Sequence, residues 1–514
     1  MTEFGGAPKT WLADEPRRAG ILLHPTSLPG PGIGDLGPAA HQWIDWLASA
    51  GQTVWQILPL VPVNDGGSPY NGLSALAGCE LLVSPTRLVE EKLLPEGADI
   101  DPGLDGNGVD YPEVARWKDE LFQRAHRTFR DTGTSELSDR FHRFRRENAS
   151  WLDDYCLFRL LRERYESAAW TDWDPEERDR DPGRLERLRT QEADALEERA
   201  FRQFLFDRQW ESVRAHARRR GILVFGDVPI FVSHDSADVW SHRDLFRLDG
   251  EGRPSVVAGV PPDAFSATGQ RWGNPIPRWE VMREKGFPWW TQRLGQIQHQ
   301  VDIARIDHFR GFEAFWEIPA DEETAVNGRW KPGPGRELFD VVSREVGEMR
   351  LVAEDLGLIT DEVYALRDSL GMPGMRVLQF AFDGDPENPY LPANYPEDTV
   401  AYTGTHDNDT VVGWYGEGAD EETRRRVDRL VDAGVEDLHW RLIRPVWRSR
   451  ARMTVAPVQD VLGLGNEARM NMPGSSDGNW AWRLEAGALT GEVAERLREE
   501  TASAERLASP EVGE

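Results

Sequence analysis

Four segments of the chain place a carboxylate shortly after an apolar run, and these residues could do acid–base or nucleophilic chemistry. A buried carboxylate without a partner costs several kcal/mol. A single case could be a salt bridge or a helix N-cap. Four cases are harder to explain in that way and favour a shared functional site. The four segments are Gly226-Asp227, Arg305-Ile306-Asp307, Glu354-Asp355 and His406-Asp407.

Two of these carboxylates have surroundings that suit the cleavage of a glycosidic bond. Retaining glycosidases use an ionised nucleophile and a protonated acid about 5–5.5 Å apart. Arg305 precedes Asp307 by two residues, so on a strand both side chains point to the same face and the cation would keep Asp307 ionised. Glu354 follows an apolar run, where desolvation would raise its pKa toward that of a general acid.

The elements that must position these residues are short apolar segments typical of buried parallel strands. Helical patterns lie between them, as at 38–50 and 360–370. Strand and helix in alternation predict an α/β fold with a parallel sheet. If the sheet is a barrel, functional side chains lie at the carboxyl ends of its strands. The predicted strands are 20–23, 53–58, 222–228, 301–306, 350–353, 375–380 and 399–402.

A long middle region differs from the rest of the chain. Between residues 82 and 220 the charge density rises, and the stretches 111–132 and 184–219 read as amphipathic helices. We expect a mostly helical insertion there, without a function of its own. From residue 490 on, the sequence predicts a final helix and then a frayed end.

The composition excludes several classes of protein. The 514 residues include two cysteines, Cys79 and Cys156, too few for a disulfide framework or a four-thiolate zinc site. No run of about 18 apolar residues and no signal-peptide pattern is present, so we expect a cytoplasmic protein without a membrane partner. A net charge of -29 argues against nucleic-acid binding. It indicates either an ordinary solvated acidic surface or a halophilic, salt-adapted protein.

Sequence motifs along nearly the whole chain carry a further signal. With them, the chain resembles the amylomaltases or disproportionating enzymes of glycoside hydrolase family 77, which are 4-α-glucanotransferases. The motifs are LLHPTSLPG at 22–30, WQILPL at 55–60, SPY at 68–70, GDVPIFV at 226–232, GVPPD at 259–263, GQRWGNP at 269–275, RIDHFRG at 305–311, AEDLG at 353–357, THDNDT at 405–410 and NWAWR at 479–483.

The resemblance implies a single (β/α)8 TIM barrel over residues 1–514, with the helical insertion at about 82–220 and no separate C-terminal β domain. It implies no metal and no organic cofactor. A loop at about 259–270 would cover the acceptor side. The enzyme would transfer α-1,4-glucan segments to the 4-hydroxyl of a glucan or glucose acceptor.

The resemblance also implies a role for particular residues. Asp307 would be the nucleophile, Glu354 the acid/base, and Asp407 the third carboxylate that grips the distorted sugar. Arg305 would orient Asp307, and His406 would lie beside Asp407. The residues implied in substrate binding are Tyr70, Asp227, Trp272, Arg305, His406 and Asn471.

Two other functions stay open at this point. A hydrolase of the α-amylase type would use the same carboxylates, and sequence alone does not separate it from a transferase. A non-catalytic glucan-binding protein has no need of the set Asp307, Glu354 and Asp407, which argues against it. His406, Asp407 and Asp409 could also be read as metal ligands, but no further ligands are recognisable. The oligomeric state is left open, and a monomer is compatible with the sequence.

Overall fold

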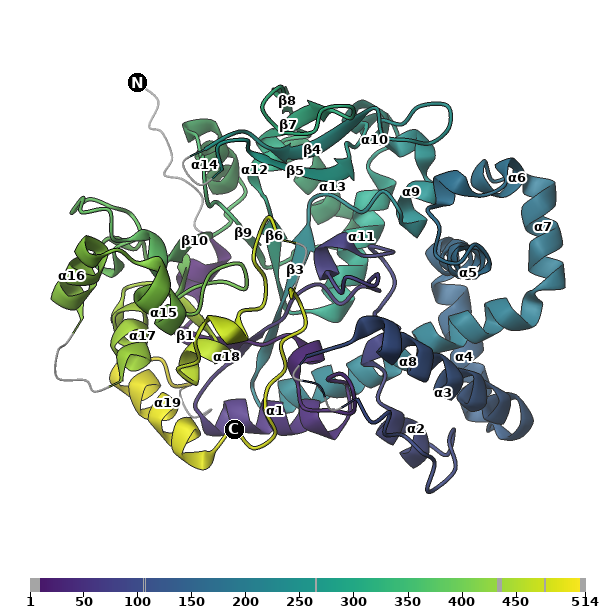
Figure 1. The fold of residues 1–514 in the computed structure, drawn as a ribbon, viewed down its shortest axis with the longest axis horizontal. Coiled ribbons are helices and arrows are strands. Elements are labelled where there is room, and N and C mark those ends of the chain that lie inside the picture. The colour runs from purple at the N-terminus through teal and green to yellow at the C-terminus, as the bar shows by residue number, and fades with distance from the viewer. Residues whose placement is uncertain are drawn as a thin grey trace.

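Eight parallel strands form a nearly closed barrel at the centre of the molecule (Figure 1). The computed structural model describes residues 10–104, 106, 108–263, 266–431, 437–475 and 478–508. The strand order is β10-β11-β12-β1-β2-β3-β6-β9, and the Ala353 N–H donates to the Pro373 carbonyl at 2.9 Å between β9 and β10. The expected (β/α)8 architecture is therefore confirmed. The strands are β1 (Arg18–Leu22), β2 (Val54–Gln56), β3 (Leu223–Pro229), β6 (Ile303–Asp307), β9 (Leu351–Ala353), β10 (Gly374–Val377), β11 (Thr399–Tyr402) and β12 (Met453–Pro457).

The barrel strands are apolar because both of their faces are buried. Every residue of β2, β9, β10, β11 and β12 is buried, as parallel sheets covered by helices require. Seven of the eight barrel strands lie within or overlap the predicted segments. The segment predicted at 375–380 ends earlier as a strand, because residues 378–380 form a 3-10 turn. Strand β12 was not predicted from the sequence.

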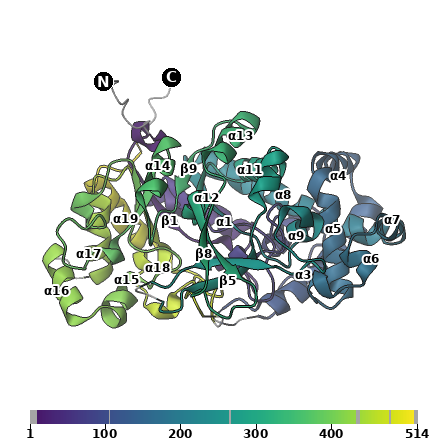
Figure 2. The same cartoon turned by 90° about the horizontal axis from the view of Figure 1, so that it is seen from above.

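Helices surround the barrel on its outer side (Figures 1 and 2). Helix α1 packs against α8 (Ala193–Arg219) of the middle region and against the C-terminal helix α19 (Gly491–Ser503). Helix α19 corresponds to the helix predicted after residue 490. These outer helices are α1 (Pro38–Ser49), α9 (Ala237–Ser241), α10 (Trp279–Glu284), α11 (Pro288–Gln300), α12 (Arg310–Glu313), α13 (Arg336–Val346), α14 (Asp361–Ser369), α15 (Val411–Gly413), α16 (Glu421–Leu430), α17 (Leu438–Arg448), α18 (Val458–Val461) and α19 (Gly491–Ser503).

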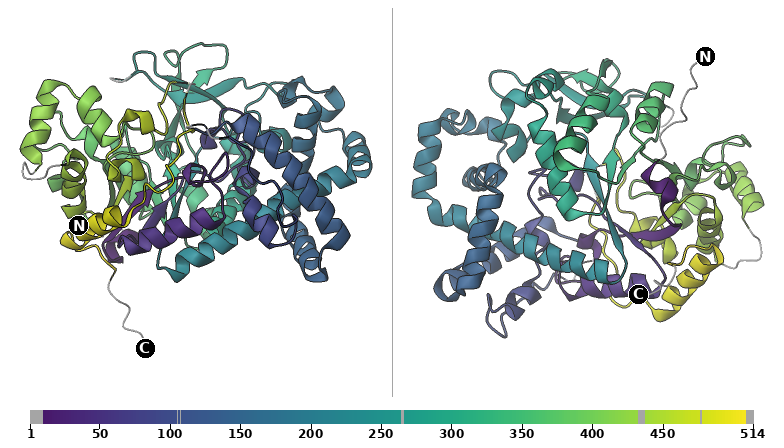
Figure 3. Two further views of the ribbon diagram at one scale, coloured as in Figure 1. Left: turned by 60° about the horizontal axis from the view of Figure 1, so that its bottom comes forward. Right: turned by 180° about the vertical axis from the view of Figure 1, so that it is seen from behind.

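The chain between β2 and β3 runs through a group of helices on one side of the barrel, opposite α16 and α17 (Figure 3). Asp110 accepts a hydrogen bond from the Glu113 N–H and so caps α3 at its predicted start. The prediction of one continuous helix over 184–219 is wrong, because the segment forms two helices, α7 and α8. The chain turns between them at Glu192, which has φ -112° and ψ 24°. The helices are α2 (Pro85–Glu90), α3 (Tyr111–Thr132), α4 (Ser135–Glu147), α5 (Ala149–Arg164), α6 (Pro175–Arg178), α7 (Pro182–Gln191) and α8 (Ala193–Arg219).

A second, antiparallel sheet lies at one end of the barrel, at the top of Figure 1. It was not predicted, because two of its strands are rich in polar residues, Gly and Pro. Helix α12, directly after β6, leads into β7 and so connects this sheet to the carboxyl end of a barrel strand. The strand order is β5-β4-β7-β8, with β4 (Val256–Val260), β5 (Gln270–Pro275), β7 (Ala314–Pro319) and β8 (Arg329–Pro332).

Two expectations from composition can be compared with the fold. Cys79 and Cys156 are buried free thiols. Within the described part of the chain, no helix combines the length and apolar character needed to cross a membrane.

Candidate active site

Three neighbouring barrel strands bring the first group of predicted site residues together. In the pairing of β3 with β6, Asp227 lies opposite Arg305. In the pairing of β6 with β9, Ile306 lies opposite Ala353, so Asp307 and Glu354 are the next residues at the two strand ends. Neighbouring strands are about 4.8 Å apart. This spacing suits the short carboxylate separation of a retaining glycosidase.

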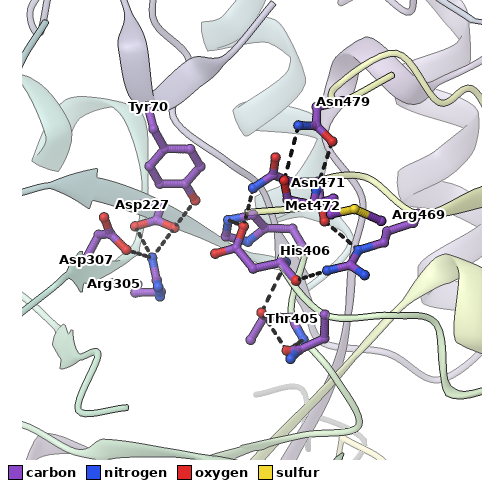
Figure 4. A network of polar contacts seen from close by, with 12 residues as sticks. Tyr70, Asp227, Arg305, Asp307, Thr405, His406, Arg469, Asn471, Met472 and Asn479 are labelled. Carbon is purple, nitrogen blue, oxygen red and sulfur yellow. Dashed lines mark hydrogen bonds and ion pairs between the residues drawn. The ribbon is translucent and has the colours of Figure 1, made fainter. Parts of the chain in front are cut away.

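Arg305 joins two carboxylates across the strand ends (Figure 4). Its Nη1 lies 2.8 Å from Asp307 Oδ1 and donates to both oxygens of Asp227 at 2.7 and 2.9 Å. The shared face predicted for Arg305 and Asp307 is thus confirmed. Burial raises the pKa of the Asp227 carboxyl, whereas the Arg305 guanidinium opposes that rise. The Arg305 guanidinium therefore neutralises part of the negative charge of Asp227 and Asp307.

Glu354 is held differently, by main-chain donors. Its Oε2 accepts from the His308 N–H at 2.8 Å and its Oε1 from the Leu356 N–H at 3.1 Å. Burial raises the pKa of Glu354 to about 8 and the nearby Asp307 charge adds to this, against the opposing effect of Arg305. This rise favours the protonated form, which a general acid requires.

His308 has a backbone conformation that is rare for a residue with a side chain. Its φ is 49°, in the left-handed region. This turn follows the nucleophile candidate and presents the His308 N–H to Glu354. The His308 ring lies edge-on to Trp272, with centroids 4.8 Å apart and an interplanar angle of 88°. One residue thus contacts both the acid/base candidate and an exposed aromatic ring.

A second group of predicted residues lies beyond the end of β11. Asn471 Nδ2 donates to Asp407 Oδ1 at 2.6 Å, and His406 Nε2 lies 3.3 Å from the same oxygen. Burial lowers the pKa of the His406 imidazole, which favours its neutral form. Asp407 itself is exposed over 39% of its side chain. A carboxylate fixed on one side and open on the other can accept hydrogen bonds from a ligand.

Tyr70 connects the two groups. Its hydroxyl donates to Asp227 Oδ2 at 2.7 Å. Its ring stacks on His406, with centroids 5.1 Å apart and planes within 10° of parallel. Trp480 packs against both rings at 5.7 and 6.0 Å. The aromatic cluster therefore holds the two carboxylate groups in a fixed relation.

Trp272 is the exposed aromatic residue of the predicted set. It lies on β5 and 38% of it is exposed. Its Nε1 donates to Gln270 Oε1 at 3.0 Å. An indole ring exposed beside the strand ends can stack on the apolar face of a sugar.

The structure therefore brings all nine predicted site residues to one end of the barrel, as two groups joined by Tyr70. Sequence reasoning assigned no role to His308, Trp480 or Arg469, although the first two lie within the quoted motifs. The metal alternative loses one ligand, because Asp409 forms an ion pair with Arg469.

The sequence of the chain matches those of known proteins. A family model described as 4-alpha-glucanotransferase, glycoside hydrolase 77, matches residues 23–490. The chain is 48% identical over 500 residues to the 4-alpha-glucanotransferase of Thermus thermophilus, covering 96% of this chain and 99% of that protein. It is 45% identical over 475 residues to the chloroplastic/amyloplastic 4-alpha-glucanotransferase of Solanum tuberosum, covering 91% and 82%.

Two solved structures align with nearly the whole chain. The amylomaltase from Streptococcus agalactiae in complex with acarbose aligns with a TM-score of 0.92 at 34% identity, covering 96% of this chain and all of that one. The amylomaltase from Corynebacterium glutamicum aligns with a TM-score of 0.77 at 18% identity, covering 97% and 77%. The second likeness concerns the fold alone.

Proposed function

The chain belongs to the 4-alpha-glucanotransferases of glycoside hydrolase family 77, and from that premise we propose the residues that carry out its transfer reaction. The enzyme moves segments of α-1,4-glucan from a donor to an acceptor. Asp307 is the nucleophile, Glu354 the acid/base and Asp407 the third carboxylate. The observation that carries this assignment is the pairing of unlike carboxyls at adjacent strand ends: Asp307 held by Arg305, and Glu354 with its pKa raised to about 8.

In the first step the donor chain is cut. Glu354 gives its proton to the glycosidic oxygen while Asp307 attacks the anomeric carbon, which forms a covalent glucosyl-enzyme. The reducing-end part of the donor leaves with the proton. Arg305 keeps the Asp307 carboxylate oriented toward the sugar, since its Nη1 lies 2.8 Å from Oδ1.

In the second step an acceptor replaces the departed segment. Glu354, now ionised, takes the proton of the acceptor's 4-hydroxyl, and that oxygen displaces Asp307 with return to the α configuration. The Arg305 guanidinium and the main-chain N–H groups of His308 and Leu356 favour the ionised form of Glu354 in this step. Hydrogen-bond donors thus stabilise the charged form of Glu354, and burial stabilises its neutral form.

Sugar binding is assigned to the residues around this pair. Asp407 accepts hydrogen bonds from hydroxyls of the distorted ring, and His406 and Asn471 hold it in place. Tyr70 and Asp227 are assigned to the nucleophile side of the site, where the Tyr70 hydroxyl donates to Asp227. Trp272 offers its exposed ring as a stacking platform.

The organisation of the chain supports transfer over hydrolysis. Residues 1–514 act as one catalytic unit, with the helices of 82–220 as an insertion. The segment 259–270, which joins β4 to β5, covers the acceptor side and limits access of water to the glucosyl-enzyme. Residues 264 and 265 of this segment lie outside the described residues.

Substrates and surroundings are also part of the proposal. Donors are maltodextrins or glycogen-derived chains, and acceptors are glucose or maltooligosaccharides. The protein acts in a cytoplasm of high salt, and the net charge of -29 supports this proposal.

Maltotriose in high-salt buffer tests this function. The sizes of the products and the total reducing ends are followed together. We expect glucose and a ladder of longer glucans at constant reducing ends, and no products from the Asp307→Asn variant. Rising reducing ends without longer glucans would make the protein an α-amylase-type hydrolase. No reaction by the folded protein would favour a non-catalytic glucan-binding protein.

A further inference from the structure

Asp407 lies in a segment that has no regular secondary structure to hold it. Strand β11 ends at Tyr402, and the next helix begins at Val411. A local turn is present, since Asn408 Oδ1 accepts from the main-chain N–H and the hydroxyl of Thr405 at 2.8 and 2.9 Å. This turn shapes the segment but does not attach it to the barrel.

Two side chains attach the segment to other parts of the chain: Gln379, whose Nε2 donates to the Asp409 carbonyl at 2.8 Å, and the more distant Arg469 (Figure 4). Arg469 donates from Nη2 to the Asp407 carbonyl at 2.6 Å and from Nε to the Asn471 carbonyl at 2.7 Å. Its Nη1 forms an ion pair with Asp409. All three nitrogens of one guanidinium are thus used, and 16% of the side chain is exposed.

The two main-chain carbonyls that Arg469 binds belong to the two residues whose side chains meet. Asn471 Nδ2 donates to Asp407 Oδ1 at 2.6 Å, and the Asn471 N–H donates to the His406 carbonyl at 3.1 Å. Arg469 therefore fixes the distance between the third carboxylate and its amide donor. We propose that Arg469 is a positioning residue for glucan transfer, which acts only through Asp407 and Asn471; this inference rests on the proposed function.

The expected consequence is a loss of rate with little loss of donor binding. A planar guanidinium with donors in a fixed fork matches three acceptors at once, which lysine does not. A catalytic group misplaced by about 1 Å can cost on the order of 100-fold in rate. The contacts of Asp407 with the distorted sugar strengthen in the transition state, so their misplacement lowers kcat more than it raises KM.

The test compares Arg469→Gln, Arg469→Lys and a matched control, Arg426→Gln. Arg426 lies on α16 and also braces a loop, since its Nη1 donates to the Phe382 carbonyl at 2.8 Å. Transfer from maltotriose gives kcat and KM, calorimetry gives the Kd of acarbose, and thermal melting gives Tm. For Arg469→Gln we expect kcat to fall about 10- to 100-fold, KM to change less than about threefold, and acarbose to bind more weakly.

The two other variants test whether the loss of kcat is specific to Arg469 and depends on the shape of its guanidinium. Arg469→Lys keeps the charge and should recover part of kcat, while Arg426→Gln should keep kcat even if its Tm falls. If Arg469→Gln does not fold, Asp409→Asn removes the ion pair that orients the guanidinium and should give a smaller fall in kcat of the same kind.

Three results would overturn the inference. They are an unchanged kcat in folded Arg469→Gln, a loss that follows Tm equally in the Arg469 and Arg426 variants, and a rise in KM without a fall in kcat. Failure of the proposed function is visible separately, because the unaltered enzyme would then form no longer glucans in the same assay.

Discussion

Glu177 in the helical insertion is a buried acid and Glu354 at the barrel mouth is a half-buried one, and the chain binds them in different ways. Glu177 is 1% exposed and accepts from Arg184 at 2.6 and 2.9 Å and from the Tyr165 hydroxyl at 2.6 Å. Glu354 has two main-chain donors and, among the described residues, no guanidinium within ion-pair distance. The first arrangement pairs a carboxylate with a guanidinium, whereas the second leaves a carboxyl whose pKa is raised by burial.

The residue next to Glu354 makes the same contrast within two positions. Asp355 is 1% exposed, forms an ion pair with Arg367 and accepts from the Met375 N–H at 2.7 Å. The structure shows what distinguishes these two neighbouring acids: Asp355 has a cation at ion-pair distance and Glu354 has main-chain donors.

The largest expected difference between the two glutamates is in activity. Glu354→Gln removes the acid/base and should lower kcat for maltotriose by on the order of 100- to 10,000-fold. Glu177→Gln should leave kcat within about threefold, because it acts through the fold alone. Equal losses of activity in the two folded variants would show that Glu354 has no greater role in the reaction than Glu177.

The two variants should differ in the opposite sense in stability. Glu177→Gln leaves two guanidinium groups without their carboxylate and should cost about 2 kcal/mol, below the range for fully buried pairs because Arg164 and Arg184 are partly exposed. Glu354 has a folded-state pKa of about 8, above its usual 4.5. Its stabilising contribution is therefore complete below pH 4.5 and lost as the pH rises through 8.

It follows that Glu354→Gln should raise Tm at pH 9 and change it little at pH 4.5. Thermal melting of both variants at the two pH values measures this. A lower Tm for Glu354→Gln at pH 9 would show that its carboxylate stabilises the fold, as that of Glu177 does.

A smaller effect is expected in the pH profile of the unaltered enzyme. Protonated Glu354 is needed for the first step, and its raised pKa places the alkaline limb of kcat/KM near pH 8. Activity should fall about tenfold for each further pH unit. Initial rates of transfer from pH 5 to 10 check this, and a limb near pH 5 would contradict the assigned acid.

Much of this arrangement could be predicted from the sequence, because local apolar runs reveal strand ends. Strand β12 was missed because it ends in Pro457, a residue that argues against a central strand. Strand β8, Arg329–Pro332, is largely exposed and contains no apolar run. The contact of Arg469 with Asp407 spans 62 positions, and no local pattern encodes such a pairing.

The smallest expected effect concerns salt. Residues 111–220 contain 24 Lys and Arg and 24 Asp and Glu, so the excess negative charge of the chain lies outside them. Screening by salt should therefore increase protection from hydrogen exchange in the barrel and its C-terminal helices more than in α3 to α8. Hydrogen exchange at low and high salt measures this. An equal response of both regions would show that the barrel is no more salt-adapted than helices α3 to α8.

The covalent intermediate tests the central claim most directly. Glu354→Gln would be treated with α-maltosyl fluoride, whose fluoride leaves without help from an acid, and the digested protein would be analysed by mass spectrometry. We expect a maltosyl group on the peptide that carries Asp307, because the variant forms the glycosyl-enzyme but has no base to release it. A glycosyl group on another carboxylate, or turnover of the fluoride without any adduct, would contradict the assignment of Asp307 as nucleophile.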